Sequence, residues 1–255
     1  MANEPLLEQH VETIARWIVE SGHLIAFTGA GISTDSGIPD FRGPDGVWTR
    51  RDAGLPAPRW GVPPERVEPN ASHSALVDLQ RLGKLHFLIT QNTDGLHRRS
   101  GIDPEVLAEL HGNGQRMRCL GCGRTHTRQE VGWDRQRWGP GYRTHRPAPG
   151  QPACAACGGR LVSSVVNFGD PLPEKELALA GRHARSCDLM LVLGSSLVVE
   201  PAASLVGLAL RRGARVVLVN RGETPYDEAV TLRVGAGIGE VVPPAVGRVK
   251  RALGG

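Results

Sequence analysis

The chain has few aromatic residues, few lysines and no long apolar run. Phe, Trp and Tyr account for 4% of its 255 residues. The longest uninterrupted apolar run, Leu189–Leu193, is far too short to span a bilayer. Glutamates interrupt the segment 4–20, where apolar residues recur at helical spacing, so we predict an amphipathic helix there and not a secretion signal. With 40% apolar residues, we expect a globular protein with no membrane partner.

Basic charge comes almost entirely from arginine and is unevenly distributed. Only Lys84, Lys175 and Lys250 are lysines, and the formal net charge is +4. The segment 113–153 holds eight arginines but only two acids, Glu130 and Asp134. Two interpretations stay open. The segment is either a solvated arginine-rich loop, which we favour, or a surface for nucleic acid or another acidic partner.

Short apolar runs alternate with helical stretches along most of the chain, which indicates an α/β fold with a Rossmann-like, doubly wound parallel sheet. The runs predict strands over 24–28, 86–90, 189–193, 215–219 and 231–234. Helical spacing predicts further helices over 72–82, 173–184 and 201–212.

Two regions break this alternation. Residues 44–70 are rich in Pro and Gly, and we predict an irregular segment above the nearby glycine loop. Residues 113–166 contain paired cysteines, arginines and several prolines. We predict that they form a small metal-binding module inserted between residues 1–112 and 167–255, which together form the larger domain.

The segment 29–43 is the most informative part of the chain. Gly29-Ala30-Gly31 follows the first predicted strand, an arrangement that brings bare backbone against a phosphate. Thr34 stands where the usual fingerprint has a third glycine, and Gly37 and Pro39 stop any helix. Asp40-Phe41-Arg42 follows at once. We infer a loop that holds a nucleotide and also acts on it.

Four of the five cysteines form two Cys-x-x-Cys pairs, Cys119 with Cys122 and Cys154 with Cys157. Two such turns supply four thiolates for one tetrahedral zinc, and a closed four-thiolate site is structural, not catalytic. A redox pair is the alternative that the doubled motif disfavours. Cys187 has no partner in the sequence pattern, and we predict a buried core thiol.

Polar residues follow three of the predicted strands. Gln91–His97 follows the second, Gly194–Ser196 follows the run 189–193, and Asn220 follows the run 215–219. Side chains at the carboxyl ends of parallel strands line the ligand crevice of an open sheet, where they can hold a ribose, a carboxamide or a water. Ordinary capping and turn formation are the alternative.

His111 and the run Val165–Gly169 flank the inserted module. A histidine at such a junction is a candidate general base, although most lone histidines have a structural, hydrogen-bonded role. The run Val165–Gly169 predicts extended backbone, either an edge strand or a segment that pairs with a bound peptide.

Taken together, these motifs resemble the sirtuins, a family of NAD-dependent protein-lysine deacylases. The resemblance runs from Gly29 to about Glu240 and rests on their order as well as their content. Gly43–Thr49, Glu109–Asn113 and Leu232–Val234 further resemble the branch of the nuclear sirtuins six and seven.

The resemblance implies roles for individual residues. His111 is the implied general base. The implied NAD-binding residues are Gly29, Ala30, Gly31, Thr34, Asp40, Phe41, Arg42, Trp48, Gln91, Asn92, Asp94, Gly194, Ser195, Ser196, Asn220 and Ile238. Val166, Phe168 and Gly169 are implied to pair with the acyl-lysine peptide, and Cys119, Cys122, Cys154 and Cys157 to hold one structural Zn²⁺.

The implied reaction consumes NAD: nicotinamide leaves, and the acyl group of the substrate lysine moves to ADP-ribose. The acidic-acyl branch uses a Tyr-x-x-Arg pair, which this chain lacks, so we expect neutral acyl groups. The alternatives are a protein mono-ADP-ribosyltransferase and a zinc-ribbon nucleic-acid binder that senses NAD. Reduced, metal-binding cysteines lead us to expect a cytoplasmic protein of undetermined oligomeric state.

Overall fold

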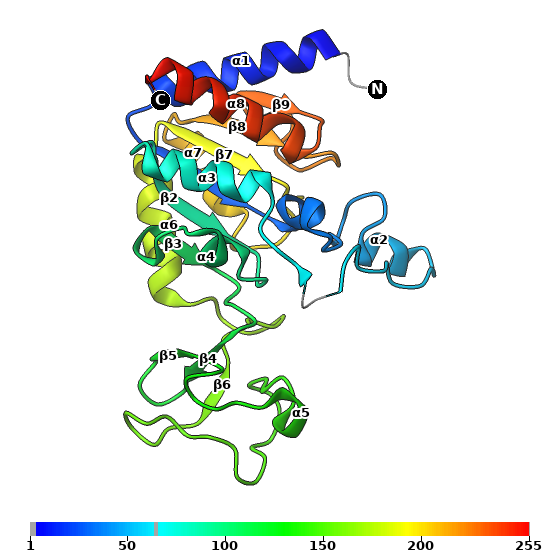
Figure 1. Ribbon diagram of the computed structural model, residues 1–255, viewed down its shortest axis with the longest axis vertical. Helices are drawn as coiled ribbons and strands as arrows, with labels where there is room; N and C mark the ends of the chain where they lie inside the picture. Colours follow the sequence, from blue (N-terminus) through cyan, green and yellow to red (C-terminus); the bar gives the residue numbers. More distant parts are fainter. Residues whose placement is uncertain (1–3, 64–65, 255) are drawn as a thin grey trace.

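The computed structural model describes residues 4–63 and 66–254. Its centre is a parallel sheet of six strands in the order β3-β2-β1-β7-β8-β9 (Figure 1). From β1 the chain adds β2 and then β3 on one side of the sheet. It then crosses to the other side of β1, where it adds β7, β8 and β9 in turn. The strands are β1 (Leu24–Thr28), β2 (Leu85–Thr90), β3 (Leu107–Glu109), β7 (Leu189–Leu193), β8 (Arg215–Val219) and β9 (Leu232–Val234).

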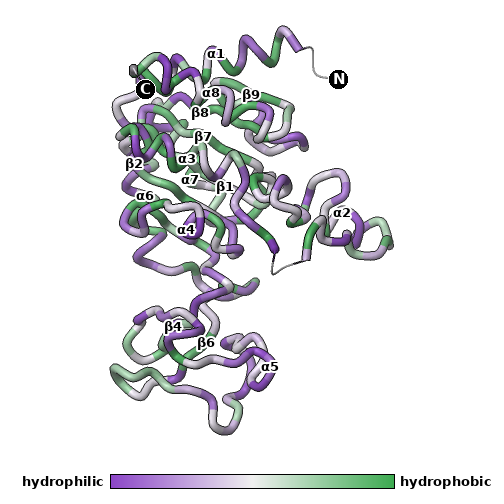
Figure 2. The backbone as a smooth tube through the Cα atoms, in the orientation of Figure 1, coloured by the Kyte–Doolittle hydropathy of each residue, from purple (hydrophilic) through white to green (hydrophobic). Residues whose placement is uncertain are grey.

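Successive strand residues point to opposite faces of the sheet. Because the residues on both faces are apolar, helices cover both faces. Leu24 and Ala26 of β1 join the core under one layer of helices, and Ile25 and Phe27 join the core under the other. The first layer contains α1 (Glu4–Glu20), α3 (Ala71–Arg81) and α8 (Ile238–Ala252), and the second contains α6 (Glu174–Ser186) and α7 (Ser204–Arg211). Figure 2 shows the strands as the most hydrophobic part of the backbone, as a sheet covered on both faces requires.

The predicted Rossmann-like sheet is therefore confirmed, and the helix over 4–20 has the predicted bounds. Helix α8 was not predicted, because Pro243 and Pro244 lie inside it and each removes a backbone hydrogen bond. The helix forms because Val241, Val242, Val246 and other apolar residues on one face are buried against α1 and α3. Tertiary packing here outweighs the local effect of the prolines.

Shorter elements connect the strands to the helices. A 3₁₀ helix, η1 (Ala30–Ser36), follows β1 directly, and a second, η3 (Pro104–Val106), precedes β3. Helix α4 (Leu96–Ser100) follows β2. Within the segment predicted to be irregular, α2 (Val47–Asp52) is a short helix and most of the other described residues form turns and loops; Pro64 and Glu65 lie outside the described residues.

A second, antiparallel sheet lies at one end of the molecule, away from the large sheet (Figure 1). It consists of β4 (Arg116–Cys119), β5 (Thr125–Thr127) and β6 (Leu161–Ser163) in the order β5-β4-β6, with helix α5 (Arg135–Trp138) nearby. Met117, Trp133 and Leu161 give it a small core of its own. All these elements fall within 113–166, which supports our proposal that these residues are a separate module.

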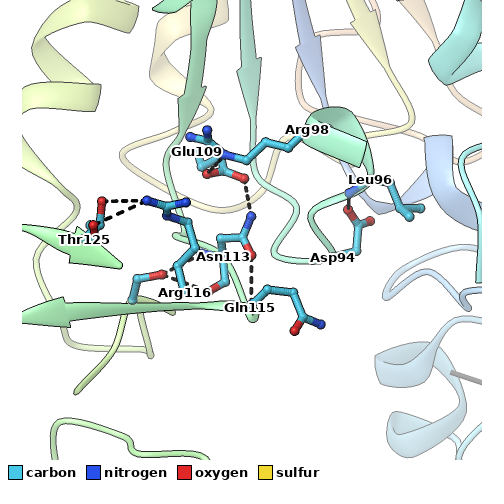
Figure 3. A network of polar contacts seen from close by, with 9 residues as sticks. Asp94, Leu96, Arg98, Glu109, Asn113, Gln115, Arg116 and Thr125 are labelled. Atoms are coloured by element: carbon cyan, nitrogen blue, oxygen red, sulfur yellow. Dashed lines mark hydrogen bonds and ion pairs between the residues drawn. The ribbon is translucent and has the colours of Figure 1, made fainter. Parts of the chain in front are cut away.

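Hydrogen bonds of buried polar side chains join this module to the large sheet. Asn113 N donates to Ser164 Oγ at 3.1 Å, and Ser164 Oγ donates to Asn113 O at 2.8 Å. The Asn113 amide also donates to Glu109 Oε1 at 2.6 Å, and Glu109 pairs with Arg98 at 2.8 Å (Figure 3). The end of β3 is thus tied to both chain crossings into the module.

Gly112 makes the closest contact at this junction. Its φ is +75°, and a Cβ built there would lie 1.9 Å from Ser164 O. We predict that Gly112→Ala lowers the free energy of unfolding by about 1–2 kcal/mol through left-handed strain and by a further 1–3 kcal/mol through overpacking. Urea denaturation measures the loss. Gly213→Ala is the control, because φ is +86° there but no atom lies within 4 Å. Equal losses in the two variants would contradict the packing argument.

Candidate active site and metal centre

The crevice of the large sheet lies where the strand order reverses, between β1 and β7 at their carboxyl ends. Backbone hydrogen bonds close this point: Gly29 N donates to Leu193 O at 3.0 Å, and Gly31 N donates to Gly194 O at 2.8 Å. A Cβ on Gly29 would lie 2.6 Å from Gly194 O, and one on Gly31 would lie 2.7 Å from Gly194 Cα. The three glycines therefore let the backbone after β1 touch the backbone after β7. This contact fixes the loop that follows β1 at the crevice.

The loop after β1 turns into η1 and not into a long helix, as the sequence predicts. Gly37 ends η1 in the left-handed region, at a φ of 86°. Thr34 bonds back into the same turn, its Oγ1 donating to Gly31 O at 3.0 Å. Gly29, at the start of η1, offers no side chain to cap the first turn. First-turn N–H groups at this position suit a phosphate.

Asn70 holds this loop from the neighbouring helix. Its Nδ2 donates to Ile32 O at 2.8 Å and to Ser36 Oγ at 3.1 Å. Its Oδ1 accepts from Ser72 N and His73 N, which caps α3. Sequence reasoning missed Asn70. A sequence signal that could have identified it is the helix-capping pattern, in which Asn70 stands three residues before the polar His73 at the start of a helical pattern.

Asn92 and Asp94, predicted to line the nicotinamide pocket, meet the loop through Ser33. Ser33 Oγ donates to Asp94 Oδ2 at 2.7 Å. The Asn92 Nδ2 donates to Gly29 O at 3.1 Å and lies 3.3 Å from Ser33 Oγ. Ser33 was not among the predicted site residues, although it lies within the glycine loop. These contacts connect the end of β2 to the loop after β1.

His111 lies at the same edge of the sheet and is partly buried. Its Nδ1 donates to Gln91 O at 3.0 Å. Burial lowers the pKa of His111, and the hydrogen bond to Gln91 opposes that shift. The ring is therefore neutral near pH 7, with Nε2 as the basic nitrogen. The Gln91 side chain is also held, because its Oε1 accepts from Ser195 Oγ at 2.7 Å.

Aromatic side chains from two predicted regions come together beside the loop. Phe41 and Trp48 lie 4.9 Å apart between ring centroids, and Trp48 and Phe168 lie 5.8 Å apart. The Arg42 guanidinium lies 4.9 Å from the Trp48 ring centroid and pairs with Asp52 at 2.9 Å. Phe168 is 83% exposed. The predicted NAD residues 41, 42 and 48 thus contact one another and a predicted peptide residue.

The run Val165–Gly169 is not the extended strand that the sequence predicts. Val166 N donates to His111 O at 2.9 Å, which anchors the first part of the run. Asp170 N then donates to Asn167 O at 2.9 Å, and Gly169 has a φ of 87°, so the run ends in a turn. Asn167 and Asp170 favour this turn because their polar side chains also bond locally, and strand-like composition alone did not reveal it.

Among the remaining predicted cofactor residues, Asp40 and Asn220 make local hydrogen bonds. Asp40 Oδ1 accepts from Gly43 N at 2.9 Å. Asn220 Nδ2 donates to Gly222 O at 2.8 Å. Ser196 is half-buried after β7. Ile238 begins α8 and is 7% exposed, with its side chain in the core, so it offers little surface to a ligand.

A buried polar network lies beneath the crevice. Thr28 Oγ1 lies 2.8 Å from Thr90 Oγ1 and 2.9 Å from His97 Nε2, and Thr90 Oγ1 accepts from Asn92 N at 3.0 Å. The His97 and His73 rings lie 5.0 Å apart. Burial lowers the pKa of His97 well below its usual value and that of His73 to about 4. Both rings are neutral at pH 7, and His97 is connected to Asn92 through the hydroxyls of Thr28 and Thr90.

The four predicted metal ligands converge. Their Sγ atoms all lie within 4.8 Å of one another, with Cys119 and Cys157 at 3.4 Å and Cys122 and Cys154 at 3.8 Å. A tetrahedral zinc with Zn–S bonds of about 2.3 Å needs S–S separations of about 3.8 Å. The four cysteines are therefore positioned to bind one zinc ion. Cys187 lies apart in the main core, as predicted, and burial raises the pKa of its thiol to about 12.

These features define a Rossmann-like nucleotide-binding protein with a structural zinc module. Comparison with known proteins gives the family. The Sir2 family model matches residues 29–59 and 56–201. The NAD-dependent protein deacetylase 1 of Bradyrhizobium diazoefficiens is 38% identical over 260 residues, which cover 94% of this chain and 97% of that protein. The chain belongs to the Sir2 family, as its resemblance to sirtuins predicts.

Other relatives extend this similarity. The NAD-dependent protein deacetylase SRT1 of Oryza sativa subsp. indica is 40% identical over 241 residues, 93% of this chain, but the match spans only 47% of that protein. Among solved structures, a Sir2 protein with a p53 peptide and NAD⁺ is 33% identical, with a TM-score of 0.70 over 96% of this chain and 98% of that one. A Sir2 homologue in complex with ADP-ribose is 35% identical, with a TM-score of 0.73 over 95% and 98%.

We predict that the buried histidines make stability depend on pH. In the unfolded chain His73 has a pKa near 6.5, against about 4 in the folded protein. The unfolded state therefore binds more protons as the pH falls below 6.5, and stability is lost progressively down to the folded pKa. Between pH 7 and pH 5 this histidine alone removes about 2 kcal/mol from the free energy of unfolding. Denaturation of His73→Gln should show a smaller loss, whereas exposed His145→Gln should match the wild type. An unchanged pH dependence in His73→Gln would contradict the assignment.

We predict one zinc ion per chain, held by all four paired cysteines. Cys157→Ala removes one thiolate, so zinc should be lost on dialysis against a chelator that the wild type withstands. Elemental analysis measures the zinc content. Cys187→Ala is the matched control and should retain full zinc, because its thiol lies in the core of the large domain. Full zinc retention by Cys157→Ala would refute a four-thiolate site.

Proposed function

We propose that this protein is an NAD-dependent protein-lysine deacylase that transfers the acyl group of an acyl-lysine to ADP-ribose. The observation that carries the proposal is the position of His111. The Gln91 carbonyl accepts from His111 Nδ1 at 3.0 Å and so orients the ring. The next residue after Gln91, Asn92, donates to Gly29 O in the glycine loop. A neutral base is thus held at the edge of the sheet where nucleotides bind. The names of the relatives support the same activity.

The residues at this edge fit NAD as a co-substrate. The uncapped first turn of η1 and the glycines at the switch point suit the pyrophosphate. Asn92 and Asp94 supply amide and carboxylate groups that suit the nicotinamide end. Bound NAD supplies an ADP-ribosyl group that becomes electrophilic as nicotinamide leaves. A redox role is disfavoured, because no second predicted strand carries an acidic residue about 20 positions past the glycines.

His111 is the proposed general base. As nicotinamide leaves, the acyl oxygen of the substrate lysine would bond to the ribose carbon that carried it, which makes the acyl carbon electrophilic. Because Nδ1 donates to Gln91 O, Nε2 can accept a proton from a neighbouring ribose hydroxyl, and this hydroxyl then attacks the acyl carbon. Attack by water releases the free lysine. The products are nicotinamide, the lysine protein and O-acyl-ADP-ribose, so no hydride moves.

The peptide is proposed to bind beside Val166, Phe168 and Gly169. Val166 already donates its N–H to His111 O, so an approaching peptide uses other backbone groups of this segment. The exposed Phe168 ring, next to Trp48, offers an apolar wall for the lysine chain and its acyl group. Since the Tyr-x-x-Arg pair is absent, we propose neutral acyl groups as substrates. A Sir2 protein with a bound myristoylated histone peptide, 32% identical with a TM-score of 0.68, supports acyl-lysine peptides as partners.

The zinc site has a structural role in this proposal. Four thiolates leave no open coordination position. The ion would brace the module whose junction with the large domain includes Gly112, next to His111. Among the described residues, no helix is both long and apolar enough to cross a membrane. Paired cysteines that bind a metal are typical of reducing compartments, which supports our proposal of a cytoplasmic location.

The proposal predicts that His111→Ala reduces turnover by about 10²–10⁴-fold, the usual contribution of a general base. Purified protein is incubated with NAD and an acetyl-lysine peptide, and peptide mass is followed. His145→Ala, at an exposed histidine in the module, should retain wild-type turnover. In the wild type, kcat/KM should stay level as the pH falls to about 6.5, the ordinary histidine pKa, and should fall only at lower pH, because burial lowers the pKa of His111. Near-normal deacylation by His111→Ala, or ADP-ribose attached to a peptide that keeps its acyl group, would overturn the proposal.

A further inference from the structure

The positive charge of this protein is concentrated in the module 113–166. That segment contains nine arginines, no lysine and two acids, a formal charge of +7. The whole chain has 30 basic and 26 acidic side chains, so the remainder holds 21 basic and 24 acidic, a formal charge of −3. Four thiolates around one Zn²⁺ add two negative charges and still leave the module at +5. The small net charge of the chain is thus the sum of a strongly basic module and a slightly acidic remainder.

Three of these arginines are used inside the module. Arg128 is buried and donates to Gly114 O at 2.9 Å and to Pro140 O at 2.8 Å. Arg116 donates to Thr125 Oγ1 at 3.2 Å (Figure 3), and Arg160 donates to His145 O. They brace the fold of the module and meet no carboxylate.

Four other arginines lie exposed within twelve residues: Arg135, Arg137, Arg143 and Arg146. Among the described residues none of the four guanidinium groups has an ion-pair or hydrogen-bond partner. The only two acids of the module are already occupied, since Asp134 caps α5 by accepting from Gln136 N at 2.7 Å and Glu130 accepts from Thr127 N at 2.6 Å. The charge of this segment is therefore not neutralised by the protein itself.

Aromatic rings alternate with these arginines. The Arg137 guanidinium lies 5.0 Å from the centroid of the half-buried Trp138 ring. The half-buried Tyr142 ring meets the His145 ring edge-on at 5.3 Å. Guanidinium groups form paired hydrogen bonds with phosphates, and exposed ring faces stack with unpaired bases. Figure 2 shows α5 as strongly hydrophilic, and Figure 1 places it at the end of the molecule opposite α1.

We propose that residues 134–146 form a binding surface for single-stranded nucleic acid, which contacts the phosphate backbone without sequence preference. Charge excess, unpaired arginines and interleaved aromatic rings are each features of such surfaces. The surface lies outside the crevice of the large sheet, so it does not rest on the proposed deacylase function. Binding at this surface would hold the protein on a polyanion such as single-stranded DNA.

Fluorescence anisotropy with a labelled single-stranded DNA of 20 nucleotides and mixed sequence tests the proposal on the zinc-loaded protein. Four phosphate contacts predict that the logarithm of the affinity falls with the logarithm of the salt concentration with a slope of about −3. The variant R135Q/R137Q/R143Q/R146Q should bind at least about tenfold more weakly at 50 mM salt, and its slope should be close to zero. It should retain zinc and the NAD-dependent activity on a short peptide.

The control variant R182Q/R185Q/R211Q/R212Q removes the same charge from exposed positions in and just after α6 and α7 and should bind like the wild type. Equal losses in the two variants would mean a nonspecific effect of net charge and would overturn the proposal. Tighter binding to a 20-base-pair duplex would overturn the single-strand assignment. Displacement of the DNA by poly-glutamate at equal charge concentration would indicate an acidic protein partner instead.

Discussion

The contact of two glycine-containing turns at the centre of the large sheet is the constraint on which the site depends. Gly29 and Gly31, after β1, lie against Gly194, after β7, so closely that no side chain fits between them. The strand order reverses between these two strands, and the crevice opens there. Because the loop is fixed to β7, η1 begins at a defined place, and no side chain caps its first turn.

The polar residues that follow the second strand, β2, contact this fixed loop and the residues around it. The end of β2 carries Gln91, whose carbonyl orients His111 and whose side chain accepts from Ser195. Asn92 and Asp94 follow and connect to the loop through Ser33. Residues from four segments far apart in the sequence thus hold one another through hydrogen bonds. His111 is also tied to the module, because its carbonyl accepts from Val166 N.

Much of this arrangement could be predicted from the sequence, and the failures have physical causes. Buried strands and the zinc ligands were found because apolar runs and doubled Cys-x-x-Cys spacing are local patterns. Helix α8 was missed because its prolines act locally, whereas the packing that stabilises it is tertiary. Ser33 and Asn70 were missed because their partners lie 61 and 38 residues away. The turn at Asn167–Asp170 was missed because the β-branched Val165 and Val166 just before it favour extended backbone.

The proposed activity consumes one NAD molecule for each acyl group removed. The most direct measurement counts nicotinamide and deacylated peptide in the same reaction, with acetyl-lysine peptide in excess and NAD limiting. Nicotinamide and deacylated peptide should appear in equal amounts at every time, and neither should form when NAD is left out. Deacylation without NAD, or nicotinamide release with no deacylated peptide, would contradict it.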